Sequence, residues 1–167
     1  YDSANYNEPS IASVSWTINK AELTDPTVTG TYTYTGTELN VEYVGYDDAL
    51  MTVGGDEAGT NAGEYTLTFT IDDTANYEWA EGSDGSVSWA ILKANYDMSG
   101  ASWDYDEAFT YDSDEKIVRA TRLPAAVPVH AYTDNAKTSA GTYTASVTFS
   151  YDSANYNEPS IASVSWT

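Results

Sequence analysis

The chain has 167 residues, no cysteine and a single histidine, His130. The absence of cysteine excludes a disulfide framework, a thiol nucleophile and a thiolate metal site. His130 stands in PVHAY, and no HExxH, GxSxG or glycine-rich phosphate loop accompanies it. We therefore expect a structural role for His130, no enzymatic activity and no cofactor apart from the calcium considered below.

Basic residues are also scarce, with 6 Lys and Arg against 26 acidic residues and a net charge of −20. Residues 18–92 hold 14 acids and the single base Lys20, whereas residues 93–167 hold 10 acids and 5 bases. Nucleic acid and anionic membrane are poor partners, because both are bound through Lys and Arg. A surface this acidic is expected to repel itself and to keep a long chain soluble and extended.

No apolar run approaches the roughly 20 residues of a membrane-spanning helix, and no segment has a convincing helical stripe. Instead, apolar residues alternate with polar ones at period two, which indicates strands. The alternation covers Tyr65 to Ile71, Tyr143 to Phe149, and the two rows Val14-Trp16-Ile18 and Val87-Trp89-Ile91. The positions that we expect in the core are Trp16, Trp89, Trp166, Tyr65, Phe69, Tyr143 and Phe149.

Shorter strands are expected between clusters of Gly, Asn and Asp that supply turns. They are Thr31–Tyr34, Leu39–Val44, Leu50–Val53, Ala108–Tyr111, Ile117–Ala120 and Val127–Tyr132. Short strands with turns every 8 to 12 residues favour an all-β fold of two tandem, small antiparallel β-sandwiches of the Ig-like kind, in an elongated rod. The alternative is a β-grasp-like arrangement with a short helix.

The chain repeats itself at two levels. YDSANYNEPSIASVSWT at residues 1–17 returns without change at 151–167, as expected for one period plus an overlap of a longer tandem array. Within the period, SVSWTINKA (13–21) returns as SVSWAILKA (86–94), and NAGEYTLTFTIDDTANY (61–77) corresponds to SAGTYTASVTFSYDSANY (139–156). We name residues 18–91 module A and residues 92–167 module B, and we assign residues 1–17 to the C-terminal strand region of a preceding repeat.

The connections between modules contain no Gly, Pro or Ser run that would act as a hinge. A strand that passes directly from one module into the next restricts bending, so we expect a semi-rigid rod. The orphan residues 1–17 are expected either to fray or to complement the sheet edge of a neighbouring chain, because they carry the apolar row of a strand.

Acidic turns near the junctions suggest a calcium site as a minority hypothesis, since hard cations bind converging carboxylate and carbonyl oxygens. None of these turns matches the DxDxDG calcium loop. The candidate ligands are Asp72, Asp73 and Asp84 in module A, and Asp112, Asp114 and Glu115 in module B. A second hypothesis concerns Lys20 and Lys93, which share strand parity with Trp16 and Trp89. They either form an isopeptide crosslink or extend along the surface with the ammonium in water.

Both modules resemble the MBG-type and YDG-type repeats of bacterial surface proteins. The resemblance rests on WTINKAEL or WAILKANYDMSG, on FTYDSDEK, and above all on NAGEYTLTF or SAGTYTASV followed by ANY. Module A departs from the pattern at Tyr34-Thr-Gly, which stands where module B has Tyr111-Asp-Ser. The resemblance implies a stalk repeat of a large adhesin attached to the wall of a Gram-positive bacterium.

The expected function is therefore structural: an extracellular, monomeric spacer that holds a separate binding head away from the cell surface. Its partners are neighbouring copies of the repeat in the same chain, with host glycan or protein bound through another domain. The alternatives are a calcium-rigidified stalk and a module that itself binds glycan or protein through exposed tyrosines such as Tyr43, Tyr46 or Tyr105.

Overall fold

The computed structural model describes residue 4 and residues 10–167. These residues form 17 strands and no helix, which confirms the all-β prediction for the described part of the chain. The strands of module A are β1 (Ala21–Leu23), β2 (Thr27–Thr29), β3 (Tyr32–Thr33), β4 (Leu39–Asn40), β5 (Glu42–Val44), β6 (Met51–Gly55), β7 (Ala58–Gly59), β8 (Gly63–Ile71), β9 (Tyr77–Trp79) and β10 (Ser86–Leu92). The strands of module B are β11 (Ser102–Trp103), β12 (Lys116–Ile117), β13 (Ala120–Thr121), β14 (Val129–Thr133), β15 (Ala136–Lys137), β16 (Tyr143–Phe149) and β17 (Val164–Trp166).

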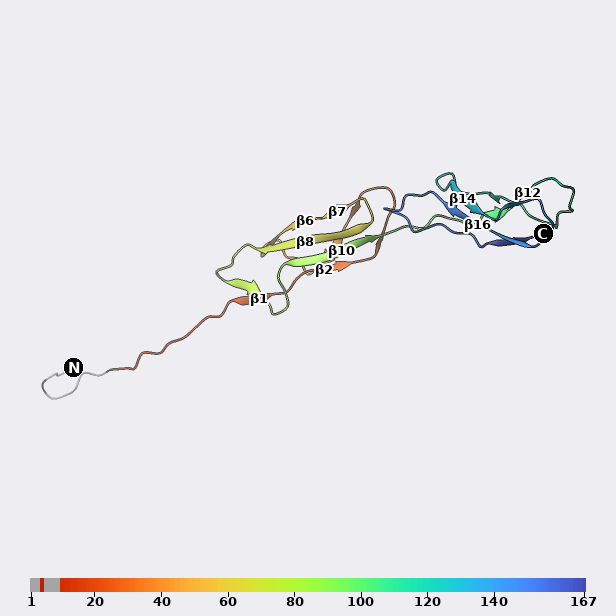
Figure 1. The fold of residues 1–167 in the computed structure, drawn as a ribbon. Coiled ribbons are helices and arrows are strands. Elements are labelled where there is room, and N and C mark those ends of the chain that lie inside the picture. Colours follow the sequence, from red (N-terminus) through yellow and green to blue (C-terminus); the bar gives the residue numbers. More distant parts are fainter. Residues whose placement is uncertain (1–3, 5–9) are drawn as a thin grey trace.

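The described strands pair in two separate groups, β1 to β10 and β11 to β17, which follow each other along an elongated molecule (Figure 1). The first group contains a four-stranded sheet of order β3-β10-β8-β6 and the pairs β1-β9, β2-β5 and β4-β7. The second contains a three-stranded sheet of order β14-β16-β17 and the pairs β11-β13 and β12-β15. β10 ends at Leu92, one residue inside module B, so this strand leads straight from one module to the next.

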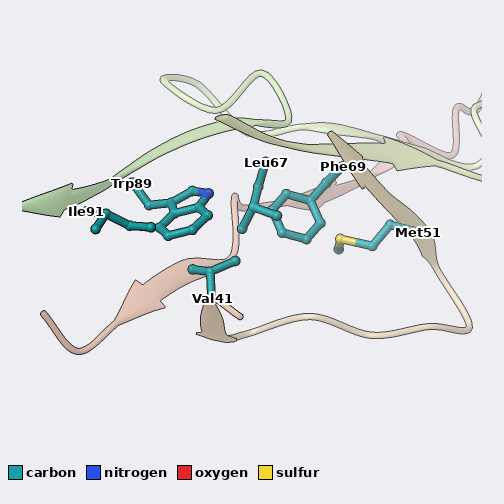
Figure 2. Close-up of a cluster of buried hydrophobic side chains, with 6 residues drawn as sticks. All are labelled: Val41, Met51, Leu67, Phe69, Trp89 and Ile91. Atoms are coloured by element: carbon teal, nitrogen blue, oxygen red, sulfur yellow. The ribbon is translucent and has the colours of Figure 1, made fainter. Parts of the chain in front are cut away.

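The core of module A lies on one face of its four-stranded sheet. In β8 the alternation places Leu67, Phe69 and Ile71 inward and the intervening threonines outward, as predicted. Figure 2 shows Val41 facing Trp89 and Ile91 from the opposite layer. Burial of each large apolar side chain stabilises the fold by about 1.5–3 kcal/mol. The buried cluster consists of Val41, Met51, Leu67, Phe69, Trp89 and Ile91.

Module B repeats the central register of module A on a smaller core. Trp89 of β10 stands opposite Tyr65 of β8, and Trp166 of β17 stands opposite Tyr143 of β16. The indole Nε1 of Trp89 donates to the Asp56 carbonyl at 2.8 Å, and that of Trp166 donates to the Asp134 carbonyl at 3.0 Å. Among the predicted core residues, Phe69, Trp89, Phe149 and Trp166 are buried and the two tyrosines are half-buried.

Two aspects of the predicted architecture are wrong. The sheets are not purely antiparallel, because β1 pairs with β9 and β3 pairs with β10 in parallel. Residues 108–111 do not form the predicted strand, and Phe109 makes a single ladder-like bond, from its N–H to the Thr167 carbonyl at 2.8 Å. The matching residues of module A, Tyr32 and Thr33, pair with Ile91 and Leu92 of β10.

Trp16 is the predicted core residue that the structure places elsewhere: it is 76% exposed, whereas Trp166 in the same sequence context is 2% exposed. Residues 10–20 form no strand and extend from module A beyond β1 (Figure 1). The prediction that Trp16 is buried is therefore wrong for this chain. Trp16 lacks the partner sheet that β16 provides to Trp166.

Candidate functional site at the junction between modules

The junction between the modules contains backbone bonds, a side-chain hydrogen bond and aromatic contacts. After β10 the chain continues through Lys93 to Ala94, which is held at once by module B. The Ala94 N–H donates to the Asn155 carbonyl at 3.0 Å, and the Asn157 N–H donates to the Ala94 carbonyl at 2.9 Å. Ala94 also forms a parallel bridge with Tyr156. The connection is thus fixed within two residues of the end of β10.

Asn155 links the two modules through its side chain. It ends a turn in which the Asp152 carboxylate accepts from the Ala154 N–H at 3.0 Å and from Asn155 Nδ2 at 3.0 Å. Its Oδ1 is thereby directed to module A, where it accepts from the Ala62 N–H at 2.8 Å. Asn155 is 7% exposed and is the one buried polar residue among the described residues. A buried polar group is costly unless it is hydrogen-bonded, so this bond favours a single arrangement of the modules.

Aromatic rings complete the junction. Tyr156 stacks on Tyr96 with ring centroids 4.1 Å apart and an interplanar angle of 14°. The edge-to-face partner of Tyr156 is Tyr34 of module A, at 5.3 Å and 79°. Tyr34 is itself fixed, because its N–H donates to the Leu92 carbonyl at 2.9 Å. An aromatic pair contributes about 0.5–1.5 kcal/mol beyond its buried area, so these contacts oppose bending between the modules.

The N-terminal end of module A repeats the backbone bond and the Asp–Asn turn of this junction. The Ala21 N–H donates to the Asn76 carbonyl at 2.9 Å, as Ala94 does to Asn155. Asp73 accepts from Asn76 Nδ2 at 2.7 Å, which matches Asp152 and Asn155. Within the part of the chain that the structure describes, however, Asn76 Oδ1 has no partner equivalent to the Ala62 N–H.

The two junction lysines hold the same turns. Lys20 Nζ donates to the Thr74 carbonyl at 2.7 Å and Lys93 Nζ donates to the Ser153 carbonyl at 2.6 Å. Both lysines are exposed. The contacts agree with a lysine that lies along the surface and caps a turn, and the isopeptide crosslink stays a prediction.

The carboxylates of these turns lead to a prediction about acid stability. The Asn155 side chain lowers the pKa of Asp152, and the Asn76 side chain lowers the pKa of Asp73, with help from backbone N–H groups and from Lys93 and Lys20. A folded-state pKa below the ordinary value gives stability that is complete above the ordinary value, near pH 4, and is lost as the pH falls through the folded pKa. We therefore expect the melting temperature to fall below about pH 4, and to fall less steeply in the Asp152→Asn variant.

NMR titration of the carboxyl carbons and thermal unfolding between neutral and acidic pH test this expectation. The control is Asp106→Asn, which removes a carboxylate that has no hydrogen-bond partner among the described residues. An acid slope that Asp106→Asn flattens as much as Asp152→Asn does would show general charge repulsion to be the cause.

The calcium candidates are distributed over three short segments, at residues 72–73, 84 and 112–115. Asp72 accepts from the Thr52 hydroxyl at 2.8 Å, Asp84 accepts from the Ser86 N–H at 2.9 Å, and Asp112 pairs with Lys116 at 2.6 Å. Asp73 holds the turn described above, and the Asp114 N–H donates to Asp112 at 3.0 Å. Among residues 4 and 10–167, no three His, Cys, Asp or Glu side chains converge on one point. Calcium binding, including any part played by Glu115, stays a prediction.

The remaining residues singled out in the sequence are His130 and the tyrosines considered as ligand contacts. His130 is exposed, with Nδ1 3.5 Å from the Ser150 hydroxyl. Tyr43 and Tyr46 pack edge-to-face on each other at 5.7 Å, and Tyr43 also packs on Phe69 at 5.4 Å. Tyr105 accepts from the Thr167 N–H at 3.1 Å. These three tyrosines are half-buried in their own modules and present only part of their rings to a ligand.

No protein-family model, curated protein or solved structure matches the chain. None of the residues that the structure describes forms a helix long and apolar enough to cross a membrane. The contacts of Asn155 and Tyr156 with module A are therefore the basis of the proposed function. The sequence predicted a restricted junction but not its residues, although the repeated Ala-Asn-Tyr of residues 75–77 and 154–156 was a usable signal.

Proposed function

We propose that the chain is a spacer repeat of a large bacterial surface adhesin, whose modules stack end to end and hold a binding head away from the cell wall. The observation that carries the proposal is the junction, where the Ala62–Asn155 hydrogen bond and the Tyr34–Tyr156 contact cross between modules. We further propose that each module is a small Ig-like sandwich, because the core of module A lies between two layers of strands (Figure 2).

The covalent connection supports the same role. A flexible linker of Gly and Ser allows its ends to vary in separation with the square root of its length. Here β10 of module A passes into the Ala94 bridge of module B with Lys93 between them, and Lys93 is itself bonded to Ser153. Force or thermal motion that bends the rod must therefore disturb the Ala62–Asn155 bond and the Tyr34–Tyr156 contact together.

The acidic surface is consistent with a spacer. The net charge of −20 is spread over both modules and disfavours association with nucleic acid or anionic lipid. The two described ion pairs, Lys116–Asp112 and Lys137–Asp134, are local pairs at the surface, and exposed pairs of this kind contribute little stability.

Small-angle X-ray scattering with and without calcium tests the proposal. We expect a narrow distribution of shapes whose maximum dimension equals two modules end to end plus the extended residues 10–20, and no change when calcium is added. A compact or widely distributed shape would contradict the stiff spacer, and an extension that requires calcium would assign the acidic turns to a calcium-rigidified stalk.

The cell-surface location has its own test. Antibodies raised against the chain are expected to label intact cells of the source organism without permeabilisation. A glycan array separates the spacer from a binding module, since a spacer gives no signal above background. Specific binding that is lost on substitution of Tyr105 would favour the binding module instead.

A further inference from the structure

One eight-residue sequence occurs twice in the described structure in opposite environments. SIASVSWT at residues 160–167 lies along module B, contains β17 and has Trp166 buried. The same SIASVSWT at residues 10–17 is exposed throughout, with Ile11 99% and Val14 83% accessible. The exposed segment thus carries the same side chains that residues 160–167 pack against module B. We call residues 10–17 the donor segment.

The place that the sequence occupies in module B is specific. Trp166 stands opposite Tyr143 in register, its ring meets Phe109 edge-to-face at 5.9 Å, and its Nε1 is bonded to Asp134. Further along, the indole of Trp103 donates to the Ala162 carbonyl at 2.8 Å. Trp16 and Ala12 occupy the same positions in the donor segment, so the segment satisfies every one of these contacts if it replaces residues 160–167.

The residues that follow the donor segment match residues that make a second set of contacts in module A. In module A, Ile91 pairs with Tyr32 and the Leu92 carbonyl accepts from the Tyr34 N–H. The corresponding residues of module B are Phe109 and Tyr111, of which Tyr111 is 62% exposed. In the donor segment Thr17 is followed by Ile18 and Asn19, which match Ile91 and Leu92 in the repeat.

The same replacement brings the donor's module A against module B of the acceptor. A surface pocket at this end of module B is lined by residues that include Phe109, Tyr111, Ala140 and Trp166. Ala140 matches Ala62 in the repeat, and its N–H has no partner among the described residues. Asn76 Oδ1 and Tyr77 of the donor match Asn155 Oδ1 and Tyr156, so the two contacts that cross the junction, Ala62–Asn155 and Tyr34–Tyr156, have counterparts in Ala140–Asn76 and Tyr111–Tyr77.

From these contacts we propose that a second copy of this chain inserts its donor segment into module B in place of β17, which joins the two copies head to tail. β-strand addition of this kind uses backbone hydrogen bonds for affinity and side-chain pockets for register. The donor segment cannot reach module B of its own chain, because Ile18, Asn19 and Lys20 alone separate it from β1, at the opposite end of the molecule from β16 (Figure 1). In a longer array the same contacts would form between successive repeats of one chain.

Full-length variants that separate donor from acceptor test the proposal. The acceptor copy carries Trp16→Ala and Trp166→Ala, which disable its donor segment and vacate its own Trp166 site. The donor copy is the unchanged chain, whose own β17 is tethered beside its site, so that association of unchanged copies with one another requires a higher concentration than the mixed complex. We expect a 1:1 complex of the two by native mass spectrometry, with no larger species, because the acceptor has no donor to pass on.

The matched control replaces the unchanged chain by the single variant Trp16→Ala, which is expected to give no complex. A second acceptor, with Trp16→Ala and Trp166→Phe, keeps a ring in the site but loses the indole bond to Asp134, so it stays testable if the alanine variant aggregates. Complex formation with both donors, or with neither, would overturn the proposal.

Discussion

Trp89→Ala is expected to lower the free energy of unfolding of module A by about 3–5 kcal/mol, the usual cost of removing a buried large aromatic ring. The ring is 4% exposed, stacks on Tyr65 at 4.7 Å and meets Tyr32 edge-to-face at 5.4 Å. Its loss also leaves the Asp56 carbonyl without the indole donor. Because a module of this size is only marginally stable, we expect module A to be largely unfolded at room temperature. Urea unfolding followed by circular dichroism measures the change.

Trp16→Ala is the matched control for this substitution, since both tryptophans stand in Ser-Val-Ser-Trp. Trp16 is exposed, so its removal should change the free energy of unfolding by less than about 0.5 kcal/mol. Similar losses in the two variants would show that the donor segment is packed in solution, contrary to the structure. A negligible loss in Trp89→Ala would contradict the assigned core.

Local pattern was sufficient to predict the central strands of each module. The period-two rows Val87-Trp89-Ile91 and Tyr143 to Phe149 were recognisable because burial on one face of a strand imposes alternation, whichever partner the strand has. The same rule located β8 and β16, the longest strands of the four-stranded and three-stranded sheets. Neither row reveals the direction of its neighbours, and so the parallel pairings of β3 and β1 were missed.

Burial of the tryptophan rows could not be predicted from their sequence, because identical sequences have different partners. Trp16 and Trp166 have the same neighbouring sequence. Trp166 pairs with β16, whereas Trp16 has no strand beside it in the described structure. Phe109 shows the reverse case, in which a strand-like sequence forms no strand and makes one backbone bond, to Thr167. Both errors concern residues whose pairing depends on a partner strand that the local sequence does not specify.

The junction was predicted as stiff, but its chemistry required coordinates. Asn155 and Ala62 are 93 residues apart, and nothing in a turn sequence indicates which amide a buried carboxamide oxygen will meet. The acidic turns illustrate the opposite problem, since Asp73, one of the suggested calcium ligands, accepts hydrogen bonds within its own turn, as Asp152 does, and calcium binding stays a prediction. A short Asp-x-Ala-Asn sequence is compatible with both roles, because a carboxylate accepts equally well from backbone N–H groups.

Asn155→Ala is expected to uncouple the two modules without unfolding either one. The substitution removes the acceptor of the Ala62 N–H, and a part-buried donor left without a partner costs about 1–3 kcal/mol. Since Asn155 Oδ1 is the partner of this amide, its hydrogen exchange reports the junction directly. We expect the Ala62 amide to exchange about 10–100 times faster in the variant, and small-angle scattering to show a wider distribution of shapes.

Asn76→Ala is the matched control, because Asn76 makes the same carboxamide bond within its own turn, to Asp73 at 2.7 Å, but meets no other module in the described structure. The Asn76→Ala substitution should remove the Asn76–Asp73 hydrogen bond of module A and leave hydrogen exchange of the Ala62 amide unchanged. Equal acceleration of Ala62 in both variants would place the effect in general turn stability and not in the junction. A change confined to Asn155→Ala would mean that one carboxamide, repeated at every second junction of an array, sets how far the rod can bend.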